Sequence, residues 1–150
     1  MRMRPSSLAI LCLGLLGLLG QATAAVDEEL LPVWKRSDGE AHVRLSTPKT
    51  MPRGMVSVSY QLVAVNTALP TPEMVVARFG VVCKSKTGEP VQLVHSHTTM
   101  FKLVKGTFVV DSDQPVSPPM EVALESHHEF AAMPAVVACN RAVAMVKASL

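Results

Sequence analysis

A chain of 150 residues with 14 basic and 12 acidic side chains has the length of one domain and little net charge. Arg2 and Arg4 fall within a predicted signal peptide, and without them the chain carries 12 basic and 12 acidic side chains. This balance gives no electrostatic reason to expect nucleic acid or an anionic membrane as a partner. Aromatic residues make up only 4% of the chain, which argues against a platform for stacking bases or sugars.

The N-terminus has the three parts of a secretory signal peptide. A basic start is followed by an apolar run over residues 8–19 and by small residues that end at Ala24. We therefore predict that residues 1–24 are a signal peptide and that residues 25–150 form a single secreted domain. The apolar run is shorter than the roughly 20 residues that span a bilayer, so no stable membrane anchor is expected. The predicted location is the periplasm or the extracellular space.

Two strands are predicted in the first part of this domain. Residues 42–46 alternate polar and apolar side chains, which is typical of a half-buried strand. Residues 56–65 alternate more clearly and are rich in β-branched and aromatic residues. Period two places Val56, Val58, Tyr60 and Leu62 on one face and Ser57, Ser59 and Gln61 on the other.

Residues 74–104 indicate two further strands joined by a turn. The turn is predicted at residues 85–90, which include Gly88 and Pro90. On the first strand, one face holds Val75, Ala77, Phe79, Val81 and Cys83. On the return strand, strict alternation places Val91, Leu93, His95, His97, Thr99, Phe101 and Leu103 on one side.

The part after this hairpin is predicted to continue as strand, loop and strand. Residues 107–111 alternate as a short strand, and residues 111–119 are rich in proline and serine, which favours an exposed loop. Residues 120–130 return to period two. There Val122, Leu124, His128 and Phe130 lie opposite Glu121, Glu125, His127 and Glu129.

The last segment, residues 135–150, carries two conflicting patterns. Val136, Cys139 and Val143 begin a stripe with spacings of three and four residues, which is typical of a helix. The apolar run at residues 135–139 also suits a buried strand, and Pro134 has no capping residue before it. Because all other elements are predicted as strands, we favour a strand over residues 136–139, followed by a strand or a short helix.

Six or seven short strands with connections marked by proline and glycine predict an all-β fold. The expected architecture is a small antiparallel β-sandwich, and an immunoglobulin-like arrangement is one form it could take.

Cys83 and Cys139 are the two cysteines of the predicted mature chain, because Cys12 lies in the apolar run of the signal peptide. Two cysteines in an exported protein most often pair, so a disulfide is predicted between them. Two free, buried thiols are the alternative.

The sequence contains a His-x-His pattern at His95 and His97. Residues two apart on a regular strand share a face, so both imidazoles could reach one zinc or copper ion. His128, on the inward side of its own predicted strand, is the expected third ligand. The alternative is structural: the three-residue pattern arises often by chance, and both histidines could be satisfied by hydrogen bonds at a sheet edge.

No motif for catalysis or phosphate binding is present: Gly-x-Ser-x-Gly, His-Glu-x-x-His and a phosphate-cradling glycine loop are all missing. We therefore expect no enzyme activity and no cofactor. The predicted function is that of a secreted or periplasmic domain that binds another protein or takes part in a surface assembly. The alternative is a periplasmic metal-binding protein that uses His95, His97 and His128 for copper or zinc.

Overall fold

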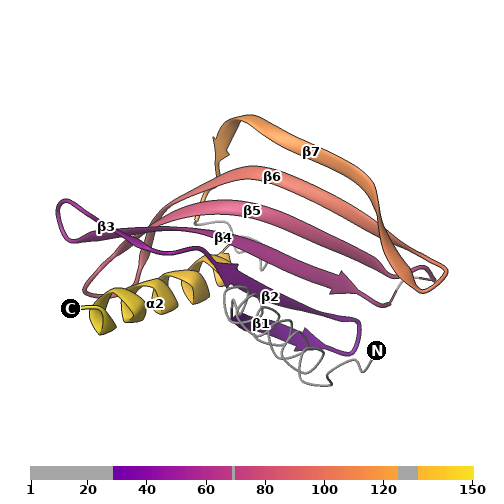
Figure 1. The fold of residues 1–150 in the computed structure, drawn as a ribbon, viewed down its shortest axis with the longest axis horizontal. Coiled ribbons are helices and arrows are strands. Elements are labelled where there is room, and N and C mark those ends of the chain that lie inside the picture. Colours follow the sequence, from indigo (N-terminus) through magenta and orange to yellow (C-terminus); the bar gives the residue numbers. More distant parts are fainter. Residues whose placement is uncertain (1–28, 69, 125–131) are drawn as a thin grey trace, which may run out of the picture.

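The segments in which β-branched residues alternate with polar ones form the central strands of an antiparallel sheet. A computed structural model describes residues 29–68, 70–124 and 132–150. Within these residues, seven strands form one sheet and one helix follows them (Figure 1). In chain order the elements are β1 (Leu30–Arg36), β2 (Gly39–Leu45), β3 (Lys49–Met51), β4 (Met55–Asn66), β5 (Glu73–Lys84), β6 (Pro90–Val104), β7 (Thr107–Glu121) and the helix α2 (Ala132–Ala148).

The strands lie side by side in the order β1-β2-β4-β5-β6-β7, and the short strand β3 pairs with β4. Every pairing is antiparallel. The strands predicted at residues 42–46 and 56–65 correspond to β2 and β4, and the predicted hairpin corresponds to β5 and β6. The outermost strands, β1 and β7, each have one neighbour in the sheet.

One face of the sheet, here called the inner face, holds the core. The buried side chains alternate along β4 and β5, as the sequence predicted, and comprise Val56, Val58, Tyr60, Leu62, Ala64, Ala77, Phe79, Val81 and Cys83. Leu93 of β6 and Val43 of β2 join them. The opposite face, here called the outer face, carries the intervening residues.

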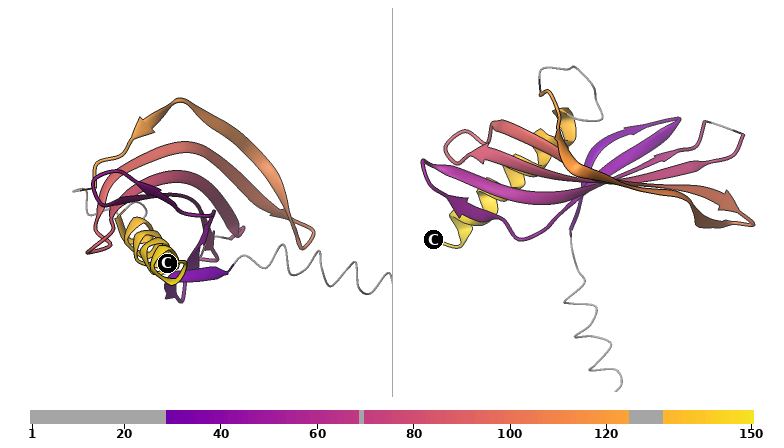
Figure 2. Two further views of the ribbon diagram at one scale, coloured as in Figure 1. Left: turned by 60° about the vertical axis from the view of Figure 1, so that its left-hand side comes forward. Right: turned by 90° about the horizontal axis from the view of Figure 1, so that it is seen from above.

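The helix α2 packs on the inner face against β1, β2, β4, β5 and β6, and the sheet curves around it (Figure 2). Met100 of β6 and Val109 of β7, also on the inner face, are exposed. The buried side chains of α2 are mostly small, which lets the helix approach the strands closely: Ala135, Ala138, Cys139, Ala142 and Val143. The turn between β5 and β6 also lies against the helix. Gly88 in this turn has a φ of +71°, and a Cβ atom there would lie 2.6 Å from Oδ1 of Asn140, so the position favours glycine.

The antiparallel β class and the Cys83–Cys139 disulfide are confirmed. The predicted β-sandwich and its immunoglobulin-like form are not confirmed. Among the described residues all seven strands belong to one sheet, and a helix takes the place of a second sheet over the core.

The prediction of a strand at residues 136–139 is wrong, because this segment belongs to α2. The stripe of Val136, Cys139 and Val143 was the correct signal. Pro134 does not break the helix, since it lies in the first turn, where a backbone N–H has no partner within the helix.

The prediction of a loop at residues 111–119 is also wrong, because these residues belong to β7. Pro118 and Pro119 lie in residues 116–119, between the positions of β7 that pair with β6, so they replace no donor of that pairing. Pro115, opposite His97, is tolerated because β7 is an edge strand, where a missing N–H group on the open side costs no hydrogen bond. Of the strand predicted at residues 120–130, only Met120 and Glu121 lie in a strand; residues 122–124 do not, and 125–130 lie outside the described residues.

Candidate functional site

His95 and His97 lie on opposite faces of the sheet. In the pairing of β5 with β6, His95 is opposite Phe79 and His97 is opposite Arg78, so that Ser96 is an extra residue in β6. This β-bulge reverses the alternation at the point where the two histidines stand. The expectation that both side chains share one face is therefore wrong.

His95 belongs to the inner face. Its ring stacks on Phe79 with centroids 4.9 Å apart, and Phe79 in turn stacks on Tyr60 at 5.4 Å. Nε2 of His95 lies 2.7 Å from Oγ1 of Thr98 and 3.1 Å from the carbonyl oxygen of His97. Since a carbonyl oxygen only accepts, a proton on Nε2 satisfies the contact to His97. The contacts fit the structural alternative, in which hydrogen bonds satisfy this histidine.

His97 belongs to the outer face, where it meets an acidic side chain of β7. Its Nε2 lies 2.5 Å from Oδ1 of Asp113, and the hydroxyl of Thr99 donates to the same oxygen at 2.7 Å. These hydrogen bonds, first from Thr99 and then from His97, lower the pKa of the Asp113 carboxyl below its ordinary value. The three side chains form a small polar cluster on the exposed surface.

The structure thus does not bring the predicted metal ligands together. His95 and His97 face away from each other, and His128 lies outside the described residues. Within the described part of the chain, no group of three or more His, Cys, Asp or Glu side chains is placed to hold an ion. Metal binding therefore stays a prediction from the sequence, and the described residues do not form the predicted site.

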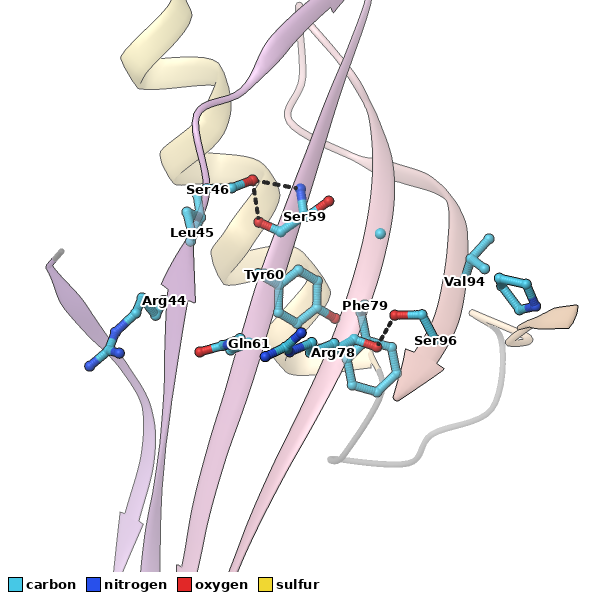
Figure 3. A pocket seen from close by; sticks show the side chains of 12 residues that line it. Arg44, Leu45, Ser46, Ser59, Tyr60, Gln61, Arg78, Phe79, Val94 and Ser96 are labelled. Carbon is cyan, nitrogen blue, oxygen red and sulfur yellow. Dashed lines mark hydrogen bonds between the residues drawn. The ribbon is translucent and has the colours of Figure 1, made fainter. Parts of the chain in front are cut away.

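The outer face has a polar half toward the turn that joins β5 and β6. A hollow of about 550 Å³ lies there (Figure 3), and it includes Gly80, where a Cβ atom would meet no other atom within 4 Å. Its lining contains Arg44, Gln61 and Arg78, and none of the described residues that line it is acidic. Ser96 donates from Oγ to the carbonyl oxygen of Arg78 at 3.2 Å, so this hydroxyl already has a partner.

The other half of the outer face is apolar. Eight side chains from four adjacent strands stand beside one another there, as the strand register shows: Val63 and Val65 of β4, Met74 and Val76 of β5, Phe101 and Leu103 of β6, and Phe108 and Val110 of β7. We call this set the apolar area. Its cross-strand pairs are Val63–Val76, Val65–Met74, Met74–Phe101, Phe101–Val110 and Leu103–Phe108.

The apolar area is partly open to solvent. Val110 is 57% exposed, and the other seven side chains are intermediate between buried and exposed. The helix α2 lies on the inner face and does not reach it. The eight side chains fill two, four and two positions in three rows across four strands. They therefore occupy about two thirds of a rectangle of about 19 Å by about 20 Å, or roughly 270 Å² in projection. The largest apolar patch on a monomeric protein is commonly of about this size and is often functional.

The two edges of the sheet are less suited to pairing with another strand. Pro32 interrupts β1, and three prolines lie in the second half of β7. Prolines on an edge remove backbone donors and hinder the addition of a further strand. The face of the sheet, and not its edge, is therefore the stronger candidate for an interaction surface.

Sequence reasoning missed the apolar area, although a signal for it was present. Residues 62–65 and 74–77 are continuous apolar runs and not alternating ones. A strand with apolar residues on both faces is typical of a sheet that is covered on both sides. The predicted apolar faces include Leu62, Val75 and Ala77, whereas four other apolar residues of the two runs lie on the outer face: Val63, Val65, Met74 and Val76.

No family model, curated protein or solved structure matches this chain. In the described residues, no helix combines the length and the apolar composition needed to cross a membrane.

Proposed function

We propose that this chain is an exported β domain that binds another protein, alone or within a surface assembly, and is not an enzyme. The observation that carries the proposal is the apolar area. Eight apolar side chains on four neighbouring strands face solvent in a chain that has a helix over its other face. Leaving such a surface in water is unfavourable, and a partner that covers it removes that cost.

The border of the apolar area suits a protein partner. On the polar side, the next outer-face residue beyond Val76 on β5 is Arg78, and the next beyond Val63 on β4 is Gln61. Asp113 of β7 lies level with Val76, with Thr99 of β6 between them. An apolar centre with a polar, partly charged rim is the usual composition of a protein interface. A lipid surface would favour an apolar patch with a basic rim, whereas this rim has both signs.

Two observations support export. The N-terminal sequence has the pattern of a signal peptide, and the Cys83–Cys139 disulfide is stable in an oxidising compartment. Export would place the apolar area in the periplasm or outside the cell, where it could meet other exported proteins.

Photo-crosslinking in the producing cell tests the proposal. A photoreactive amino acid is placed at position 110, on the outer face, and separately at position 109. Val109 is the matched control, because it is the preceding residue of the same strand, is 38% exposed and pairs with Lys102 on the inner face. Mass spectrometry identifies each adduct.

We expect a discrete protein adduct from position 110 and none from position 109. The purified adduct protein should then bind wild type and Val109→Glu with equal affinity, and Val110→Glu at least tenfold more weakly. Adducts only to lipid, no adduct at position 110, or equal adducts from both positions would contradict a protein-binding outer face.

A further inference from the structure

We propose that the partner of the apolar area is a second copy of this chain, packed face to face so that the two sheets form one two-layer β structure. This inference rests on the proposed function and specifies the partner. In such a dimer the second copy covers the outer face, as α2 packs on the inner face.

The width of the apolar area favours a sheet as its partner. A helix with its side chains is about 10–12 Å across, whereas the four strands that carry the apolar area span about 19 Å. A second sheet can cover four strands at once, because sheets pack face to face about 10 Å apart. A second copy of this chain supplies a sheet face of the same width, the same twist and the same apolar content.

The outer face is large enough for a dimer interface if the polar border is buried with the apolar area. A standard interface buries about 800 Å² on each partner, and about 56–65% of that area is apolar. The apolar centre of roughly 270 Å² in projection supplies about a third of such an interface, and the polar border around it would supply the rest. Two identical patches related by a two-fold axis also match each other in hydrophobicity.

The charges of the chain permit two copies to approach. The border of the apolar area carries both signs, with Arg78 beyond Val76 along β5, Asp113 on β7 and Glu40 opposite Val65 on β2. A border of one sign would repel its own copy, and a mixed border does not. Without residues 1–24, the chain has equal numbers of basic and acidic side chains, so long-range repulsion between copies is small.

The test is sedimentation equilibrium of the oxidised chain of residues 25–150, from about 1 µM to about 100 µM, a range that brackets weak dimers. The variants are Val110→Glu on the outer face and Val109→Glu on the inner face. Both side chains are substantially exposed, so neither substitution places a charge in the core. Circular dichroism verifies that each variant is folded.

We expect wild type and Val109→Glu to be dimers and Val110→Glu to be a monomer. Val110→Ser removes the apolar contact without adding a charge. It should weaken the dimer about tenfold or more, because both copies carry the substitution and two valine side chains are lost from the interface. If Val110→Glu is not folded, the Val110→Ser result decides.

A wild type that is monomeric over the whole range would overturn the dimer, as would a Val109→Glu variant that dissociates as readily as Val110→Glu. The two proposals fail in distinguishable ways. A monomeric protein that still forms an adduct with a different protein at position 110 retains the binding function and loses only the dimer. A monomer with no protein adduct at that position contradicts both.

Discussion

Cys83 of β5 and Cys139 of α2 form a disulfide, with their Cα atoms 5.7 Å apart. The bond ties the sheet to the helix that covers its inner face, and both side chains are fully buried. It joins positions 56 residues apart, and β6 and β7 lie between them. The bond therefore restricts the unfolded chain over the two strands that contribute half of the apolar area.

Removal of this disulfide should cost about 4 kcal/mol of the free energy of unfolding, since the closed loop limits the unfolded chain. Urea denaturation of the oxidised protein, the reduced protein and the Cys83→Ala/Cys139→Ala double variant measures the effect. Reductant should lower the urea midpoint of wild type and leave the double variant unchanged. A wild-type midpoint that does not move on reduction would show that the loop contributes nothing.

The alternation along β4 predicts which substitutions the strand tolerates. Val58 is 4% exposed and Tyr60 2%, so Val58→Asp or Tyr60→Asp buries an unpaired carboxylate and should cost about 3–5 kcal/mol. Ser57 and Ser59 lie on the outer face, where Ser57→Leu and Ser59→Leu should change stability by about 0.5 kcal/mol or less. Urea midpoints compare the two sets. Equal losses would mean that the face assignment is wrong.

The fold was predictable where information is local. In β4 and β5 the side chains alternate because one face is buried, and the sequence shows that period directly. The pairing of Cys83 with Cys139 followed from cysteine count and predicted export. The helix α2 was visible as a stripe with spacings of three and four, but the neighbouring strands led to the wrong choice between two patterns.

What could not be predicted depends on pairing between strands. The bulge at Ser96 is defined by the pairing of β6 with its neighbours, and the sequence around Ser96 does not mark an extra residue. The three prolines of β7 favour a loop unless the strand is known to lie at the edge of the sheet. The expectation that His95 and His97 share a face is wrong for the first of these reasons, because a bulge of one residue moves a side chain to the other face.

The Thr99 hydroxyl should control the acidity of Asp113. Thr99→Val removes the hydrogen bond that contributes most to the lowered pKa of this carboxyl, so its pKa should rise toward the ordinary value. Carbon-13 NMR of the carboxyl group against pH measures the change. Thr98→Val is the matched control, since Thr98 contacts His95 and not Asp113. An Asp113 pKa that is the same in wild type and Thr99→Val would contradict the role of this hydrogen bond.

The sign of the associated pH dependence follows from the lowered pKa. The ionised carboxylate is favoured in the folded state, so its contribution to stability is present above the unfolded pKa of about 3.9. That contribution is lost as the pH falls through the lower pKa of the folded state. Below about pH 4, Thr99→Val should therefore lose less stability on acidification than wild type does.

The buried hydroxyl of Tyr60 should make the protein less stable than a phenylalanine at this position would. The side chain is 2% exposed, and its oxygen has no hydrogen-bond partner in the part of the chain that the structure describes. An unsatisfied buried hydroxyl costs about 1–3 kcal/mol. Tyr60→Phe keeps the ring that stacks on Phe79, so it should raise the free energy of unfolding by about 1 kcal/mol.

The gain from Tyr60→Phe should grow in alkaline solution. Burial raises the pKa of the Tyr60 hydroxyl, whereas the same group in the unfolded chain ionises near pH 10. Wild type therefore loses stability as the pH rises above about 10, and the variant lacks this part of the loss. Urea denaturation at pH 7 and at about pH 10.5 measures both effects, with Ser57→Ala on the outer face of the same strand as the control. A Tyr60→Phe variant less stable than wild type at pH 7 would show that the hydroxyl has a partner in the folded protein.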